Sequence, residues 1–359
     1  MQDIDDLRKD IDDIDDLILE KLNQRMKFVK KIGELKQTNG SPIYRPEREK
    51  AILNRLESYE DNLLNKSAIE SIYLEIFAVS RNIEMPQKIA YLGPEGTYTY
   101  QAAESRFGAM SEYLALASIE SVFTKLSQKE VKYGVVPIEN NTEGVVGATF
   151  DCLAKFENVK IVSEIYLDIH HSFISLNENL KNIKTIYSHP QGYNQCRNFL
   201  ESHMLSGVTF IAAKSTAHAA FLASKDKESA AICSKIAAKL YNVPIMFETI
   251  EDNMANRTRF FVLSDFKTNK TKHSKTSILA KTDHLPGSLA DLLNLFKSEN
   301  INLSKLESRP IKQREFRSLF FIDFDGHIDD DRVQNVLKSC KKIGIEVTWL
   351  GSYLNGDEG

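Results

Sequence analysis

The chain has 359 residues, of which 42% are hydrophobic and 27% charged, as expected for a folded protein of two or three domains. Its formal net charge of −4 argues against a nucleic-acid-coating protein, and its 16 Gly and 9 Pro residues exclude a collagen-like or low-complexity chain. An acidic N-terminus without an apolar core and the lack of a long apolar run predict neither a signal peptide nor a membrane span. The four cysteines form no C-x-x-C pair, which predicts reduced thiols in a soluble cytoplasmic protein.

One long helix is predicted over residues 3–36. This segment has no Pro and a single glycine, Gly33, and it carries nine acidic residues in its first part and mostly basic ones later. The helix dipole favours that order of charge. Its apolar residues follow alternating steps of three and four, the spacing of one helical stripe: Ile4, Leu7, Ile11, Ile14 and Ile18. A helix of more than 30 residues predicts a bundle or paired helices.

Two charged residues interrupt the continuation of this stripe. Arg25 and Lys36 are 11 positions apart, and at 100° per residue they lie about 20° from the same helix face. A charge on the inner face of a bundle is costly unless it is paired. The pattern therefore predicts either a pocket for an anion or two side chains that extend out to solvent.

Two further helices are predicted after the Asn39–Pro42 loop. The first begins near Pro46 and turns Glu49 toward its apolar face, and the second covers about residues 67–84. Ser80 and Glu84 lie on the apolar stripe of the second helix. Each of these polar residues taken alone is also compatible with a partly exposed position.

Residues 1–85 resemble the all-helical chorismate mutase domain. The matching segments are Leu7–Ile11, Gln24-Arg25, Gly33–Lys36, Arg45–Glu49 and Ser80–Glu84. The resemblance implies a three-helix chain that forms an intertwined dimer and rearranges the dicarboxylate chorismate to prephenate without a cofactor. A floppy substrate must be held in one conformer, and its breaking ether oxygen must be stabilised.

The same resemblance assigns roles to individual residues. Arg25, together with Arg8 of the partner subunit, would bind the carboxylates. Lys36 and Glu84 would bind the ether oxygen, and Glu49 would bind a hydroxyl. Arg48 and Ser80 complete the expected site. The chain departs from some members of the family in having Arg45 in place of an Asp and Glu84 in place of a Gln.

The middle of the chain alternates strands and helices, which predicts an α/β domain with mainly parallel sheets. Polar residues gather where strands give way to helices, and ligands bind at such strand ends. The junctions are Gly93–Thr97, Val135–Asn140, Ile186–Gln191 and Ile211–Thr216. His189 could serve as a base or as a helix cap. Phosphate-loop, G-x-S-x-G and H-E-x-x-H motifs are missing.

Residues 88–265 resemble prephenate dehydratase, whose hallmark triplet stands here as Thr258-Arg259-Phe260. The Gly93–Thr97, Val136–Asn140 and Ser188–Gln191 segments and Gln195 also match. The resemblance implies two α/β lobes around a cleft, like periplasmic ligand-binding proteins, and conversion of prephenate to phenylpyruvate without a metal, flavin or nicotinamide.

By this analogy Thr258 lies at the leaving hydroxyl as proton donor or positioner, and Arg259 clamps a carboxylate. From the strand pattern alone, Arg259 could equally point to solvent. The expected cleft residues are Glu139, Asn140, Ser188 and Gln195. Aromatisation with loss of CO₂ drives the reaction, so protonation of the hydroxyl and placement of charge are what the site must supply.

The Lys-rich segment 267–275 is predicted to be a linker before a small domain at residues 274–354. Its elements follow the ferredoxin-like βαββαβ order: strand 276–281, helix 288–299, strands 303–307 and 318–324, helix 330–341 and strand 346–350. This domain has no catalytic set, so the pattern is also compatible with a dimerisation module.

The small domain resembles the ACT domain fused to prephenate dehydratases. The resemblance rests on the Pro286–Ala290 and Glu307–Pro310 segments, and it implies inhibition by L-phenylalanine bound across a dimer interface. The expected ligand contacts are Gly287, Ser288, Leu289, Ala290, Asn302, Glu307, Ser308, Arg309 and Pro310.

The three resemblances occur in the order of the bifunctional chorismate mutase/prephenate dehydratase family. We therefore expect both reactions and feedback inhibition by L-phenylalanine in a homodimer or homotetramer that binds neither nucleic acid nor membranes. One alternative is a non-catalytic small-molecule sensor, and the Thr258-Arg259-Phe260 triplet argues against it. Another is a dehydratase whose helical segment is only a dimerisation arm; the joint presence of Arg8, Arg25, Lys36, Arg48 and Glu49 argues against that.

Overall fold

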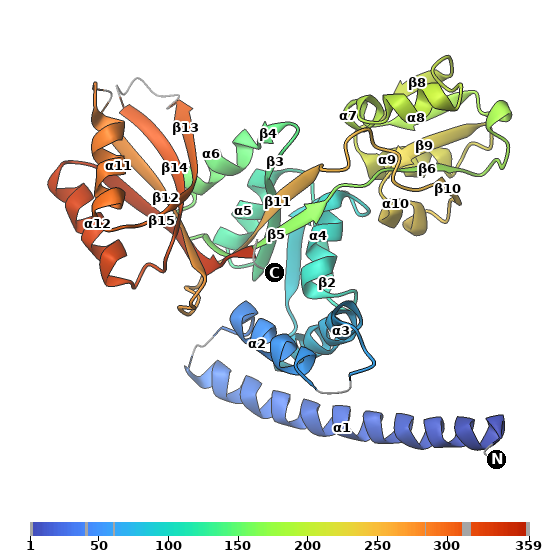
Figure 1. Cartoon of the computed structure of the whole chain (residues 1–359), viewed down its shortest axis with the longest axis horizontal. Coiled ribbons are helices and arrows are strands. Elements are labelled where there is room, and N and C mark those ends of the chain that lie inside the picture. The colour runs from blue at the N-terminus through green and yellow to red at the C-terminus, as the bar shows by residue number, and fades with distance from the viewer. Residues whose placement is uncertain (1–2, 40–41, 60–61, 284, 311–316, 357–359) are drawn as a thin grey trace. The chain divides into compact units, whose positions relative to one another are not determined.

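The computed structural model describes residues 3–39, 42–59, 62–283, 285–310 and 317–356 (Figure 1). It divides the chain into two compact units, Met1–Gln87 with Phe107–Glu112, and Lys88–Arg106 with Tyr113–Gly359. Among the described residues, no helix has both the length and the apolar character needed to cross a membrane.

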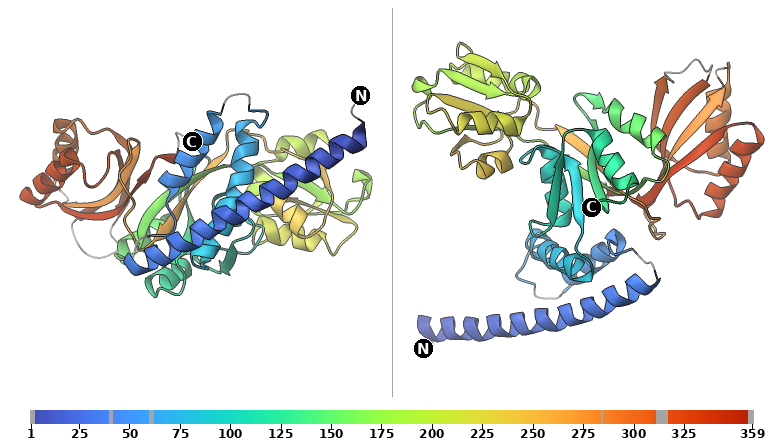
Figure 2. Two further views of the ribbon diagram at one scale, coloured as in Figure 1. Left: turned by 90° about the horizontal axis from the view of Figure 1, so that it is seen from below. Right: turned by 180° about the vertical axis from the view of Figure 1, so that it is seen from behind.

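The first unit is helical and consists of α1 (Ile4–Asn39), α2 (Pro46–Glu57) and α3 (Lys66–Glu84). The predicted long helix is confirmed, and Figure 2 shows α1 as one continuous rod. Asp3 begins it by accepting hydrogen bonds from the amides of Asp5 and Asp6, each at 2.9 Å, which satisfies backbone donors that the first turn leaves without a partner.

A turn from the following segment belongs to the helical unit. Arg81 of α3 donates a hydrogen bond to the carbonyl oxygen of Phe107 at 3.0 Å. The Glu75 carboxylate accepts a hydrogen bond from the amide of Ala109 at 2.8 Å. Residues on both sides of this turn are part of the second unit, so the helical unit is not a single continuous stretch of sequence.

The second unit begins with a lobe built on a six-stranded sheet. Its strands lie in the order β2 (Glu112–Leu116), β1 (Lys88–Leu92), β3 (Tyr133–Asn140), β11 (Arg257–Ser264) and β5 (Lys160–Asp168), with β4 (Gly144–Val145) paired to β3. The helices of this lobe are α4 (Tyr98–Phe107), α5 (Ile119–Ser127) and α6 (Gly147–Lys155).

A second lobe carries a five-stranded sheet. Its order is β10 (Ile245–Phe247), β6 (Ser172–Ser175), β9 (Ser229–Cys233), β7 (Thr185–Ser188) and β8 (Thr209–Ala212). The connecting elements are η1 (Leu180–Asn182), α7 (Pro190–Asn194), α8 (Arg197–Ser202), α9 (Thr216–Ala223) and α10 (Lys235–Leu240). Small side chains of α9, β9 and α10 form much of the core of this lobe.

The chain passes between the two lobes twice, from β5 to β6 and from β10 back to β11. The two passages are hydrogen-bonded side by side, since the amide of Ile169 donates to the carbonyl of Asn256 at 2.8 Å and that of Ile250 to the carbonyl of His171 at 3.0 Å. Because β11 returns from the second lobe, it runs antiparallel to β3 and to β5. The prediction of mainly parallel sheets was therefore wrong, and both sheets are mixed.

The third sheet has the order β13 (Leu303–Pro310), β14 (Arg317–Asp325), β12 (Ser274–Asp283) and β15 (Glu346–Leu354). With α11 (Ser288–Ser298) and α12 (Asp331–Lys342) it forms the predicted βαββαβ order, and each strand is longer than expected. Both helices pack on one face, where Leu292 and Phe296 of α11 and Val336 of α12 contact Ile278 and Ile322.

The opposite face of the third sheet shares a hydrophobic core with the first lobe. Phe321 and Tyr353 lie in one buried cluster with Phe150 and Phe261, and the Phe150 and Phe321 rings are 4.7 Å apart in an edge-to-face contact. The segment predicted as a linker takes part in this packing, because its last residue, Lys275, belongs to β12 and is 3% exposed.

Candidate functional sites

The first candidate site is a cleft of about 430 Å³ in the second unit. It lies where β1 and β3 end and β11 begins, beside α7 and the start of α9, as predicted from the strand–helix junctions. The lining residues are Leu92, Gly93, Thr97, Tyr98, Thr99, Asn140, Ile169, His171, His189, Gln191, Gly192, Gln195, Lys214, Ser215, Thr216 and Thr258.

Three of the predicted cleft residues, Asn140, Gln195 and Thr258, line the cleft directly. Asn140 and Thr258 face each other across the β3–β11 pair, and the Asn140 Nδ2 donates to the Thr258 Oγ1 at 2.7 Å. The Asn140 Oδ1 accepts from the amide of Thr142 at 2.9 Å. Since these backbone contacts fix the amide orientation, Thr258 is the acceptor in its bond with Asn140, and its own hydroxyl proton can be donated elsewhere.

Ser188 lies at the end of β7 and is buried. Its hydroxyl donates to the carbonyl of the next residue, His189, at 2.9 Å. His189 occupies the N-cap position of α7, but its side chain makes no capping hydrogen bond. His189 thus takes the predicted N-cap position through its backbone alone, and the imidazole lines the cleft.

His171, a cleft residue that the sequence reasoning missed, sits on the first passage between the lobes. Its Nδ1 is 2.7 Å from the Tyr98 hydroxyl and its Nε2 is 2.9 Å from the Gln195 Oε1. Burial lowers the pKa of this imidazole, which favours the neutral ring. With the Gln195 oxygen as acceptor, Nε2 carries the proton. The Tyr98 hydroxyl donates to the carbonyl of His170 at 2.8 Å. Adjacent histidines at a strand end were the available sequence signal.

Lys214 lies in the predicted Ile211–Thr216 junction, but sequence reasoning did not single it out. It is exposed and precedes Ser215, whose side chain caps α9 by accepting from the amide of His218 at 3.0 Å. Lys214 places a positive charge on the wall of the cleft, next to the amides of a helix start. Both features favour a carboxylate ligand.

Arg259 and Glu139 lie outside the cleft, contrary to expectation. Successive side chains of a strand point to opposite faces, so Thr258 and Asn140 in the cleft place their neighbours on the other face of the sheet. The Arg259 side chain is 3% exposed and contacts carboxylates of Glu139, Glu164 and Asp323. The structure therefore contradicts both the carboxylate clamp in the cleft and the solvent-facing position that the strand pattern allowed.

The second candidate site lies in the helical unit, where α1 packs on α3. The Lys36 Nζ is 2.6 Å from the Glu84 Oε2, and the two side chains are 16% and 11% exposed. Arg25 donates to the Ser80 hydroxyl. Burial lowers the pKa of the Arg25 guanidinium, so an anion beside it would offset a desolvation cost. Arg25 and Lys36 of α1 thus contact Ser80 and Glu84 of α3, and Lys36 does not extend into solvent.

Among the remaining predicted residues of the helical unit, Glu49 is near enough for its charge to act on Arg25. Glu49 pairs with Arg81, which sequence reasoning did not single out. Arg48 is exposed, and Arg8 is exposed and pairs with Asp5 at 3.0 Å. The apolar stripe beside Arg8 is also exposed in the single chain and comprises Ile4, Leu7, Ile11, Ile14 and Ile18.

Gly33 allows the close approach of α1 and α3 at this site. A Cβ atom added to Gly33 would lie 2.9 Å from the Glu84 Cα, and a backbone atom cannot move aside as a flexible side chain can. We expect Gly33→Ala to separate the helices and lower chorismate consumption at least about tenfold, because small displacements of catalytic groups are costly. Prephenate consumption should not change.

Steady-state assays of both activities test this prediction. Gly207→Ala serves as the control, because nothing lies within 4 Å of a Cβ atom at that position. Equal chorismate consumption by the Gly33 variant and the wild type would contradict the proposed role of the close approach.

The predicted effector segments lie at the same end of the third sheet's strands. Pro310 at the end of β13 pairs with Ser318, and Asp283 at the end of β12 pairs with Arg317. The two segments therefore lie at the same end of the sheet, on either side of β14. Gly287 caps α11 with a φ of 91°, a left-handed conformation that favours glycine.

Other predicted effector contacts have these positions. Ser288 lines a hollow of about 570 Å³ between α11 and the loop after α12, whereas Leu289 packs against the helix-side core. Ala290 lies on α11, and Asn302 donates to the Asp325 carboxylate at 3.1 Å. Glu307 and Ser308 lie on β13. The side chains of Arg309 and Pro310 lie outside the described part of the chain.

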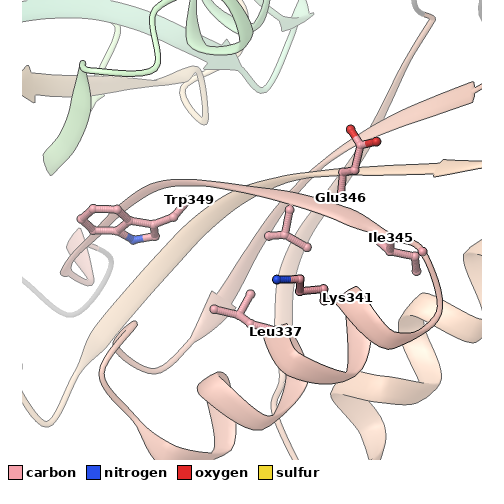
Figure 3. A pocket seen from close by; sticks show the side chains of 7 residues that line it. Leu337, Lys341, Ile345, Glu346 and Trp349 are labelled. Carbon is pink, nitrogen blue, oxygen red and sulfur yellow. The ribbon is translucent and has the colours of Figure 1, made fainter.

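Another hollow, of about 450 Å³, lies between α12 and β15. Figure 3 shows Leu337 and Lys341 projecting from the helix and Trp349 from the strand. It contains none of the predicted site residues. Within the described ranges, no group of three or more His, Cys, Asp or Glu is arranged to hold a metal ion.

Three family models match the chain in succession. Residues 7–85 match chorismate mutase type II, residues 89–268 match prephenate dehydratase and residues 276–341 match the ACT domain. Among curated relatives, the bifunctional chorismate mutase/prephenate dehydratase of Aquifex aeolicus is 38% identical over 98% of both chains. The protein of the same name from Pseudomonas aeruginosa is 37% identical over 97% of this chain and 96% of its own.

Solved structures resemble the second unit. Prephenate dehydratase from Arthrobacter aurescens, in complex with L-Phe, is 30% identical and covers 76% of this chain and 91% of its own, with a TM-score of 0.69. Prephenate dehydratase from Staphylococcus aureus is 27% identical and covers 74% of this chain and 99% of its own, with a TM-score of 0.62.

Proposed function

The chain belongs to the family of bifunctional chorismate mutase/prephenate dehydratases, and we propose that its two reactions occur at the two separate sites described above. It rearranges chorismate to prephenate and converts prephenate to phenylpyruvate, CO₂ and water in L-phenylalanine biosynthesis. The observation that carries the site assignment is the pairing of polar groups at each site, Lys36 with Glu84 and Asn140 with Thr258.

For the mutase reaction, the substrate must be held in a folded conformer while its ether bond breaks. Arg25 and Arg8 of the partner subunit bind the two carboxylates, and Lys36 donates to the ether oxygen as negative charge develops there. Glu84 orients Lys36 through their ion pair. Ser80 orients Arg25, and Glu49 and Arg48 lie at the margin of the site.

For the dehydratase reaction, the ring carboxylate leaves as CO₂, and its electron pair enters the ring as the hydroxyl leaves with a proton as water. Thr258 donates a hydrogen bond to the leaving hydroxyl, because Asn140 already supplies the hydrogen bond that the Thr258 oxygen accepts. Gln195 and the neutral His171 align the substrate. Lys214 and the start of α9 bind a carboxylate.

We propose that the chain is at least a homodimer. The exposed apolar stripe on the first half of α1 resembles a helix surface that lacks its packing partner, and Arg8 lies on the same half of the helix. A second copy would cover the stripe and bring Arg8 to the neighbouring mutase site. Sedimentation of the purified protein measures the assembly directly.

We further propose that the protein works in the cytoplasm. All four cysteines are free and buried, which is compatible with a reducing compartment. Chorismate and prephenate are its substrates, and neither a nucleic acid nor a membrane is part of the proposal.

A spectrophotometric assay with chorismate, then with prephenate, tests the proposed function. The wild-type chain should consume both and form phenylpyruvate. Consumption of prephenate alone would favour the dimerisation-arm alternative for the helical unit.

L-Phenylalanine is proposed as the effector of the ACT domain. The proposal is supported by the complex of the Arthrobacter aurescens prephenate dehydratase with L-Phe and by the position of the two segments at the same end of the sheet. The proposed contacts are Gly287 through Ala290 on one subunit and Asn302 with Glu307 through Pro310 on the other. By linkage, the effector must bind the less active conformation more tightly.

Ser308→Tyr should abolish the heat of L-phenylalanine binding in calorimetry, because the larger side chain fills the effector site. Ser308 is exposed, so the substitution should leave the fold intact. Ser298→Tyr at the far end of α11 provides the control and should bind as the wild type does. Equal affinity of the Ser308 variant and the wild type would remove this segment from the effector site.

A further inference from the structure

A buried cluster of charges joins the dehydratase sheet to the ACT sheet. The first lobe contributes Glu139 of β3, Glu164 of β5 and Arg259 of β11. The ACT sheet contributes from all four of its strands: Lys275 and Ser277 of β12, Lys305 of β13, Asp323 of β14 and Tyr353 of β15. We call these eight residues the interface cluster.

Arg259 is the centre of the interface cluster. Its Nη2 is 2.6 Å from the Glu164 carboxylate, and its Nη1 is 2.6 Å from Asp323 and 3.1 Å from Glu139. The Nη2 also donates to the Tyr353 hydroxyl at 3.1 Å. One guanidinium therefore contacts two strands of its own sheet and two strands of the ACT sheet.

The charges of the cluster balance. Lys275 binds Glu164 at 2.8 Å, and Lys305 binds Glu139, so three cations stand beside three carboxylates. Glu164 and Asp323 side chains are fully buried, and those of Arg259 and Lys275 are 3% exposed. Burial alone would raise the pKa of Glu139, but the hydrogen bond from Lys305 and the charge of Arg259 hold it below its ordinary value.

The two sheets can pack against each other without these charges. Buried ion clusters contribute little net stability compared with well-packed apolar residues, and Phe321 and Phe261 supply such packing beside the cluster. What charged and hydrogen-bonded groups add is a fixed relative position, since a displaced buried charge loses its partners at a high cost.

The interface cluster and the cleft are formed by side chains on opposite faces of the same two strands. Thr258 pairs with Asn140 and Arg259 pairs with Glu139 on the same two strands, so consecutive residues on each strand belong to the cleft and to the cluster. Because neighbouring residues are about 3.3 Å apart along a strand, a shift of Arg259 or Glu139 is transmitted directly to Thr258 or Asn140.

The ACT side of the cluster reaches the effector strand. Lys305, which binds Glu139, lies on β13 two residues before Glu307, the first residue of the effector segment. A change in β13 when L-phenylalanine binds would therefore act on Glu139 without an intervening element.

We propose that Asp323 and Lys305 of the ACT domain are positioning residues for the dehydratase reaction, acting through Arg259 and Glu139 on Thr258 and Asn140. This proposal rests on the proposed function of the cleft and of the effector site. In this proposal the interface cluster couples the effector site to the cleft. The conformation that binds L-phenylalanine more tightly holds the Thr258–Asn140 pair in a less productive position.

The test compares full-length wild type with Asp323→Asn, which keeps the size of the side chain and removes its charge. Prephenate kcat should fall about tenfold or more with KM changed less than about threefold, since misplaced groups affect the transition state more than substrate binding. Chorismate consumption should not change. Asp329→Asn is the matched control, because Asp329 forms an exposed ion pair with Lys267.

Calorimetry measures the coupling itself. The Kd of L-phenylalanine is determined with and without phenylpyruvate, the product of the cleft, and the ratio of the two values is the coupling factor. The factor should differ from one in the wild type and in Asp329→Asn, and it should approach one in Asp323→Asn. The effector should still release heat with that variant.

A second pair of variants applies if Asp323→Asn does not fold. Lys305 is 19% exposed, so Lys305→Met should fold. In this variant the coupling factor should move toward one. Lys305→Arg should restore the wild-type factor by keeping a cation beside Glu139. Folded Asp323 and Lys305 variants with wild-type kcat and coupling would overturn the proposal. So would a loss in Lys305→Met that Lys305→Arg fails to restore. A wild type that consumes no prephenate would overturn the proposed function instead.

Discussion

Replacing Thr258 with valine should lower prephenate turnover by a factor of about 10²–10⁴, the range that general acid groups contribute, and leave chorismate turnover unchanged. Valine has nearly the shape of threonine and favours strands, so the change removes the hydroxyl with little other disturbance. The loss should appear in kcat, because the hydrogen bond to the leaving hydroxyl strengthens as that group departs.

The environment of Thr258 makes this substitution interpretable. Asn140 loses one partner, but its Nδ2 also donates to the Asn256 Oδ1 at 2.7 Å. The amide therefore stays satisfied and the fold should hold. Thr258→Ser keeps the hydroxyl and should retain most of the activity. Thr258→Val with wild-type kcat for prephenate would show that this hydroxyl does not act in the reaction.

Lys36→Met should lower chorismate turnover by a factor of about 10²–10³, as expected for the loss of one preorganised donor to developing negative charge. Prephenate turnover should be unchanged, because Lys36 belongs to the helical unit and the cleft to the other. The thioether side chain fills the space of the lysine stem but supplies no hydrogen bond to the ether oxygen.

A control is needed because the single change leaves Glu84, 11% exposed, without its cation, and such a charge destabilises the fold. The double variant Lys36→Met/Glu84→Gln removes both charges and should recover thermal stability without recovering chorismate turnover. Recovery of turnover together with stability would mean that Lys36 holds the helices in place and does not contact substrate.

Local patterns in the sequence were sufficient for the elements and their order. The three- and four-residue spacing of isoleucine and leucine predicted α1, and the same helical geometry placed Arg25 and Lys36 on one face. In the structure they are close to Ser80 and Glu84 of α3. Helical periodicity fixes which residues share a face, so a charge on an apolar stripe is visible before the partner helix is known.

Residues that became neighbours through long-range packing were not predictable in this way. His171 and Lys214 line the cleft from a passage between lobes and from the start of a helix, and neither position belongs to a periodic pattern. Glu49 pairs with Arg81 from another helix. Lys275, in a segment whose polar composition suggested a linker, is buried against Glu164.

The sequence by itself determined the three kinds of domain, the long helix, the polar strand ends and the Thr258-Arg259-Phe260 triplet. Only the tertiary structure decided that Thr258 lines the cleft while Arg259 contacts the sheet of the ACT domain. A strand presents alternate residues to opposite faces, but which face meets the cleft depends on the strands that pair with it and on the sheet packed behind it. That sheet meets Arg259 through Asp323, which is 64 positions away in the sequence, and no local pattern contains such a contact.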